Sequence, residues 1–195
     1  MENRIGEIIE SSTSEIAAQC YDLYELPPFG SLVKTKGKTG NMYGIVYNAA
    51  TASIEPGRRP IARGKDESSE EAIYQSSPQL VKLFRSEFKA LIVGYRENDK
   101  IYQLLPPQPA HLHNFVFQCL PDEVKEFSQS FSFLSLLINS QLSISSTELI
   151  TAVLRNMSRL QDDKRSFLVA AGKELSNLFC GQYQQLKLVL ERLQI

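Results

Sequence analysis

The spacing of hydrophobic residues in this 195-residue chain changes near Leu120. Before that point, short segments rich in β-branched and aromatic residues are separated by Gly, Pro, Asn or Asp, and in MYGIVYN (42–48) the apolar side chains alternate with period two. After it, apolar residues recur at the helical period of 3.6. The spacing therefore predicts an α+β chain, with a β domain over residues 1–118 and a helical domain over residues 119–195.

The first part predicts a small all-β barrel. We expect strands at IGEII, FGSLVKT, MYGIVYN, FKALIVGY and IYQLL, the last two forming a hairpin. Closing such a series into a barrel removes the exposed edges. Residues 65–87 interrupt the strands as an insertion: the acidic run DESSEE predicts a solvated loop, and Ser77-Pro78 predicts the start of a short helix with Leu80, Val81 and Phe84 on one face.

The second part predicts a helical bundle. A helix is expected to begin at Pro121, with one apolar stripe formed by Val124, Phe127, Phe131, Leu134 and Ile138. Another begins at Ser145, where Glu148 has the spacing of a capping box, and a third begins near Asp162 or Asp163. The last stripe starts at Tyr183. These stripes must pack on one another or on the barrel.

The segment VKTKGKTGNMYGIVY, residues 33–47, contains Gly37-Lys38-Thr39, which is also the end of an ATP-binding phosphate loop. That loop requires a glycine at position 32, where this chain has Leu, and it must open a helix. Here a turn entering a strand follows. We therefore expect a β-hairpin with a lysine-rich turn, and no ATP binding.

Composition restricts the class of protein. The net charge of −1 gives no global support for binding nucleic acid or acidic membranes. The three cysteines form no CxxC pair, so neither a disulfide framework nor a zinc site is expected. MENRIGEIIES lacks the features of a secretory signal, and no apolar run reaches about 18 residues. We expect a soluble, cytoplasmic protein.

The sequence contains no enzyme signature. His111 and His113 lie two apart, and in a strand they would share a face, but two ligands do not make a metal site. Both histidines lie in the Pro-rich connector LLPPQPAHLHNF, and no GxSxG, HExxH or GxGxxG motif occurs. We expect no catalytic residues, no metal and no cofactor.

Arg58, Arg59 and Arg63 form the best candidate site, in the segment IEPGRRPIARG (54–64). Three guanidinium groups on a loop constrained by Gly and Pro suit a partner that offers carboxylates or phosphates. A second interpretation is an exposed turn whose arginines only pair with the acids of DESSEE, residues 66–71.

The ordered series RIGEIIESSTSEIAAQCYD, PFGSLVKTK, MYGIVYN, RPIARG, SPQLVKLFRSEFKALIVGY and LLPPQP resembles a HAS-barrel domain over residues 3–118. This barrel is shared by the N-termini of HerA-type DNA-translocating ATPases and of the F-type ATP synthase α and β subunits. Those families continue into a RecA-like ATPase domain, whereas helices are predicted here. This combination resembles stand-alone barrel proteins of cyanobacterial type.

The resemblance implies that the barrel packs beside neighbouring barrels in an assembly. We therefore expect a non-enzymatic interaction or assembly module that docks on a HerA-like or F-type ATPase, or on itself. The alternative is a nucleic-acid-associated accessory factor acting with a HerA-like translocase. It would bind the phosphate backbone through Lys34, Lys36, Lys38 and the three arginines.

Overall fold

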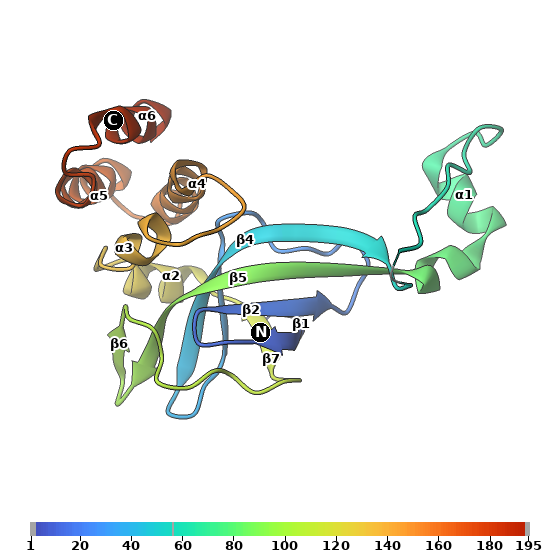
Figure 1. Ribbon diagram of the computed structural model, residues 1–195, viewed down its shortest axis with the longest axis horizontal. Helices are drawn as coiled ribbons and strands as arrows, with labels where there is room; N and C mark the ends of the chain where they lie inside the picture. Colours follow the sequence, from blue (N-terminus) through green and yellow to red (C-terminus); the bar gives the residue numbers. More distant parts are fainter. Residues whose placement is uncertain (1–2, 56, 194–195) are drawn as a thin grey trace.

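The computed structural model describes residues 3–55 and 57–193, and its N-terminal part is a closed antiparallel β-barrel (Figure 1). The strand order is β2-β1-β7-β3-β4-β5, and β5 pairs back with β2. A short strand, β6, extends the sheet beyond β5. The predicted α+β class and barrel are confirmed. The strands are β1 (Arg4–Ser11), β2 (Glu15–Cys20), β3 (Leu32–Lys36), β4 (Asn41–Ser53), β5 (Phe84–Glu97), β6 (Lys100–Tyr102) and β7 (Phe115–Gln118).

Two barrel strands, β2 and β7, were not predicted from the period-two pattern. EIAAQC, the sequence of β2, contains small and polar residues, and β7 is only four residues long. Both are needed to close the barrel, because β2 joins β1 to β5 and β7 joins β1 to β3. Their inward-facing side chains complete an apolar interior that includes Ile8, Ile16, Val33, Val46, Phe88, Ile92 and Val116.

The helical part comprises α2 (Pro121–Phe127), α3 (Leu134–Ile138), α4 (Ser146–Ser158), α5 (Lys164–Leu178) and α6 (Tyr183–Leu193). The predicted starts at Pro121, Ser145 and Asp163 match the helix or its N-cap. The capping box at Ser145 is wrong. Its hydroxyl lies 2.7 Å from Thr147 Oγ1, and Glu148 pairs instead with Arg192 on α6.

The single apolar stripe predicted between Val124 and Ile138 is also wrong, because the helix is interrupted between Phe127 and Leu134. The buried side chain of Gln103, just beyond β6, occupies the break. Its amide donates to the carbonyls of Phe127 (2.7 Å) and Ser130 (3.0 Å), and its oxygen accepts from the N–H of Phe133 (3.0 Å). These bonds satisfy backbone groups that a continuous helix would satisfy internally.

The helices pack on the outer surface of the barrel through a single apolar cluster. Tyr43 and Val93 of the barrel belong to the same cluster as Phe127, Phe133 and the apolar face of α4. The rings of Tyr43 and Phe127 are 5.2 Å apart, and those of Phe127 and Phe133 are 5.4 Å apart. The last strand ends at Gln118 and the first helix of this part begins at Pro121, but one apolar cluster contains residues from both parts. The division into two domains between residues 118 and 119 therefore stays a prediction.

The insertion differs from its prediction in both bounds and content. β4 ends at Ser53 and β5 begins at Phe84, so residues 84–87 belong to a strand. An α-helix, α1 (Glu70–Ser76), begins within the acidic run that predicted a loop, with Ser69 as its N-cap. After Ser77-Pro78 the chain forms a 3-10 helix, η1 (Pro78–Leu83), in which Leu80 is buried but Val81 is 47% exposed. The tighter 3-10 geometry rotates Val81 away from the expected shared face.

No described helix has the length and apolar character needed to cross a bilayer.

Candidate functional site

The long β4–β5 hairpin carries the insertion away from the barrel (Figure 1). β3 pairs with β4 only as far as Ile45, and β2 pairs with β5 only at residues 87–91. Beyond these points β4 and β5 continue to pair with each other as far as Ser53 and Phe84, and the N–H of Ile54 donates to the carbonyl of Leu83 (2.9 Å). Residues 54–83 therefore form a projecting unit, called the arm below.

The three predicted site arginines lie together on the arm. Arg58, Arg59 and Arg63 line one cavity of about 510 Å³, and all three are exposed. Arg58 forms an ion pair with Glu55 at 2.9 Å, and this contact raises the pKa of its guanidinium. Within the described residues, no ion pair joins these arginines to residues 66–71, which the second interpretation required. Two guanidinium groups are thus available to a partner.

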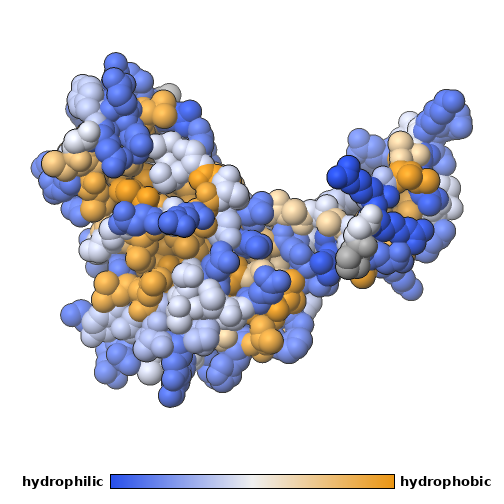
Figure 2. Space-filling model, in the orientation of Figure 1, coloured by the Kyte–Doolittle hydropathy of each residue, from blue (hydrophilic) through white to orange (hydrophobic). Residues whose placement is uncertain are grey.

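The floor of this cavity is apolar, which the sequence did not predict. Its apolar and aromatic lining comes from three separate segments: Tyr24 before β3, Ile61 in the arginine loop, and Ile73, Tyr74, Leu80, Leu83 and Phe84 from α1, η1 and β5. Ile61 is 73% exposed. Figure 2 shows hydrophobic and strongly hydrophilic surface side by side on the arm. Apolar lining with a few charged groups is typical of binding cavities of this size.

Hydrogen bonds tie the arm to the barrel through Tyr24. Its hydroxyl lies 2.6 Å from that of Tyr74 on α1, and its N–H donates to Ser86 Oγ at 2.9 Å. Ser86 Oγ is in turn 2.8 Å from Thr51 Oγ1 across the hairpin. Tyr24 has φ = 70°, an unfavourable value for a side chain of this size, so these contacts hold a strained backbone. No signal in the sequence indicates this anchor, because its partners Tyr74 and Ser86 are distant in the chain.

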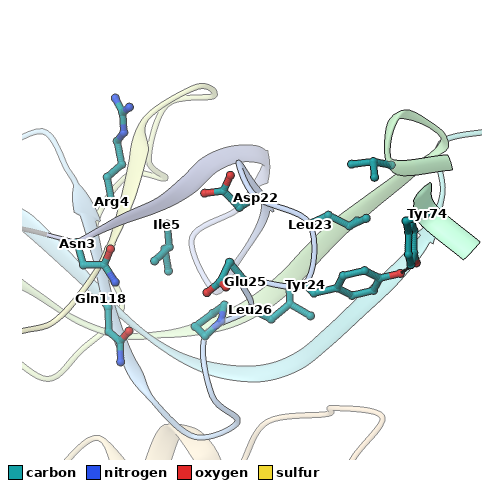
Figure 3. Close-up of a pocket in the computed structure, with 12 residues that line it drawn as sticks. Asn3, Arg4, Ile5, Asp22, Leu23, Tyr24, Glu25, Leu26, Tyr74 and Gln118 are labelled. Atoms are coloured by element: carbon teal, nitrogen blue, oxygen red, sulfur yellow. Dashed lines mark hydrogen bonds between the residues drawn. The ribbon is translucent and has the colours of Figure 1, made fainter. Parts of the chain in front are cut away.

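A second hollow, of about 700 Å³, separates the arm from the barrel (Figure 3). Figure 3 shows Tyr24 and Tyr74 meeting at one side of it, while Arg4 points away from them. Arg4 lies instead against the rings of Tyr21 and Phe115, at 4.9 and 4.7 Å from their centroids. The lining of this hollow mixes Arg4, Asp22 and Glu25 with neutral polar and apolar groups, so it presents no single chemistry to a ligand.

The expected β-hairpin is present around Gly37-Lys38-Thr39, with Lys36 of β3 opposite Asn41 of β4. Lys34 is only 5% exposed, and its Nζ lies 2.6 Å from Glu123 on α2, so it does not contribute to a surface patch. Lys36 and Lys38 precede β4 and the arginines follow it, so the two sets lie up to about 40 Å apart along the strand. They do not form one continuous basic surface.

His111 and His113 lie in a turn and not in a strand. His113 has φ = 65°, which is a left-handed and not an extended backbone conformation. His113 Nδ1 is 3.1 Å from Glu7 on β1. Over residues 3–55 and 57–193 no three His, Cys, Asp or Glu side chains are grouped so that they could hold a metal ion. Cys20 and Cys119 are buried, and burial raises the pKa of both thiols.

The chain matches no protein-family model, and no curated protein matches its sequence.

Proposed function

We propose that this chain is a non-enzymatic interaction and assembly module. The arm is the main support for this proposal. The β4–β5 hairpin extends beyond the barrel, and the arm at its end presents an apolar cavity lined also by three exposed arginines. A projecting element with this surface suits contact with another macromolecule, because arginine and aromatic residues are favoured where proteins bind one another. The barrel and the helices form the body that positions it.

The partner class rests on the resemblance to HAS barrels. A barrel-bearing ATPase of the HerA or F type, or a second copy of this chain, would meet the barrel side by side, and the arm would add a contact at a distance from it. The chain's own residues supply the contact and no chemistry. The cytoplasm is the compartment that suits this partner.

The nucleic-acid alternative has weaker support. Lys34 is buried against Glu123, and the remaining lysines are separated from the arginines by the length of β4. Binding to a phosphate backbone needs several cations along one path. The separation favours a protein partner for the arginines alone.

The test is affinity capture by the full-length tagged chain from native lysate, followed by binding between the purified components. The matched control is an arm-free variant, in which an Asn-Gly pair replaces residues 55–82. Because Ile54 and Leu83 are already hydrogen-bonded across the hairpin, this pair can close them with a two-residue turn. Stoichiometric retention of a barrel-bearing ATPase, or concentration-dependent self-association, supports the module. A chain that stays monomeric and retains no protein, or that hydrolyses ATP, contradicts it.

A further inference from the structure

The outer edge of β4 has unpaired backbone groups beyond the barrel. The N–H of Ile54 donates to the carbonyl of Leu83, so those two residues form a hydrogen-bonded pair of the antiparallel ladder. Such pairs alternate along a ladder, which places the N–H and C=O groups of Ala52 and Ala50 toward β5. The same groups of Ala49, Thr51 and Ser53 therefore point to the other edge.

No described strand pairs with that edge. β3 ends its pairing with β4 at Ile45, and residues 48–52 are all exposed. The segment NAATAS (48–53) has neither a charged residue nor a proline, and its register with β5 is regular. Exposed edges are ordinarily protected by lysine, proline or a bulge, because they otherwise accept another strand. This edge lacks those protections over six residues.

The edge leads directly into the arginine cavity. Thr51 and Ser53 line that cavity, so a strand added beside them would place alternate side chains over its apolar floor. The charged lining consists of the three arginines and two carboxylates, Glu55 and Glu70, which leaves an excess of positive charge. An incoming segment with carboxylates at this end is complementary to it.

We infer that the outer edge of β4 binds an extended acidic peptide segment of a partner protein by strand addition. Main-chain hydrogen bonds form at Ala49, Thr51 and Ser53, apolar side chains enter the cavity, and acidic side chains meet Arg59 and Arg63. Backbone pairing supplies affinity, and the cavity supplies selectivity. This inference rests on the proposed function and specifies the partner's chemistry at the arm.

A synthetic peptide tests it directly with the full-length chain. The probe is a fluorescein-labelled peptide of alternating valine and threonine that ends in three aspartates, and binding is measured by fluorescence polarisation. Saturable binding is expected, together with its loss when lysines replace the aspartates. Arg59→Ala with Arg63→Ala should weaken binding by about tenfold or more, as loss of charge-assisted hydrogen bonds predicts.

Strand addition is separated from simple charge attraction by two further changes. Ala49→Pro removes one outward N–H without touching the bonds to β5, and Ala49→Thr is the matched control that keeps the N–H. Only the proline variant should lose binding, at an unchanged melting temperature. Two further peptides are N-methylated at alternate amides, one at the odd positions and one at the even positions. Only one of these two sets of amides faces β4, so one peptide should lose binding and the other should keep it. This result does not depend on the folding of any variant.

Several outcomes overturn the inference. Equal loss of binding by both N-methylated peptides, or equal binding of the peptide by both Ala49 variants, excludes pairing at this edge. Tighter binding of a single-stranded oligonucleotide than of the peptide identifies a nucleic-acid surface. A dimer that Ala49→Pro dissociates, with no peptide binding, identifies a second copy as the occupant. If the cellular partner is retained equally by wild type and by the proline and arginine variants, the module function stands and this site is wrong.

Discussion

The Gln103 side chain joins the end of β6 to the break between α2 and α3. Its amide makes three bonds to backbone groups of Phe127, Ser130 and Phe133. Gln103→Leu keeps the approximate volume but leaves these groups without partners, each of which costs about 1–3 kcal/mol when buried. We expect the free energy of unfolding to fall by about 2–4 kcal/mol in urea titrations.

The matched control is Gln129→Leu in the same break. Gln129 is exposed, so the same substitution there should change stability by less than about 0.5 kcal/mol. Equal losses in the two variants would show that the Gln103 bonds contribute nothing specific.

The three cysteines should differ sharply in reactivity. Cys180 is exposed, whereas Cys20 and Cys119 are buried. Burial raises the pKa of Cys20 to about 11 and shifts the pKa of Cys119 upward as well, so at pH 8 both remain protonated and unreactive. A disulfide reagent such as DTNB should modify one thiol rapidly in the native protein and all three after unfolding. A second fast thiol in the native protein would contradict this burial.

At the scale of elements, the sequence predicted those whose signal is local. β4 and β5 contain large β-branched and aromatic residues at period two, and α4 and α5 have regular stripes with Ser145 and Asp163 at their N-caps. The helix break after Phe127 was missed because Gln103, which occupies it, is distant in sequence. Pairing partners and long-range hydrogen bonds, and not propensity, decide such elements.

The loop before β3 is held against α4 by a glycine that no other residue can replace without strain. Gly30 has φ = 75°, and a Cβ there would lie 2.8 Å from Ala152 Cβ and 2.9 Å from the Val153 nitrogen. Asn156 on α4 donates to the carbonyl of Phe29 beside it at 2.9 Å. Gly30→Ala should therefore combine a positive-φ cost of about 1–2 kcal/mol with an overpacking cost of about 1–3 kcal/mol.

Gly181→Ala isolates the first of these costs. Gly181 has φ = 79°, but nothing lies within 4 Å of the position its Cβ would take. Urea unfolding of both variants should show the larger loss at Gly30. If the two losses are the same, the loop does not press on α4.

At the scale of the whole molecule, the candidate site shows what sequence alone could predict. The arginines stood out because their charges are adjacent in sequence and flanked by Gly and Pro. The cavity floor did not, because Tyr24, Ile73 and Phe84 meet only after β4 and β5 have paired. The open edge of β4 left a weak signal, a run of small uncharged residues after a strongly apolar strand. Spatial convergence and free hydrogen-bonding groups arise only in the folded chain.

The arm and the body should respond differently to proteolysis. The arginine loop and the acidic run are exposed, and α1 contains no buried residue, so trypsin should cut first within residues 57–65. The nicked chain should remain one particle, because β4 and β5 still pair along the hairpin and the apolar cluster still joins Tyr43 and Val93 to the helices. Size-exclusion chromatography and mass spectrometry of the digest measure this.

Unfolding of that nicked particle tests whether barrel and helices form one cooperative unit. Since one cluster spans both, far-ultraviolet circular dichroism, which is dominated by the helices, and tyrosine fluorescence, to which β4, β5 and β6 contribute Tyr43, Tyr47, Tyr95 and Tyr102, should report the same midpoint. The arm-free variant should share this single transition, because its deletion removes none of that cluster. Two separated midpoints in the nicked particle would mean that the helices unfold while the barrel stays folded and that the contact between Tyr43 and Phe127 contributes little.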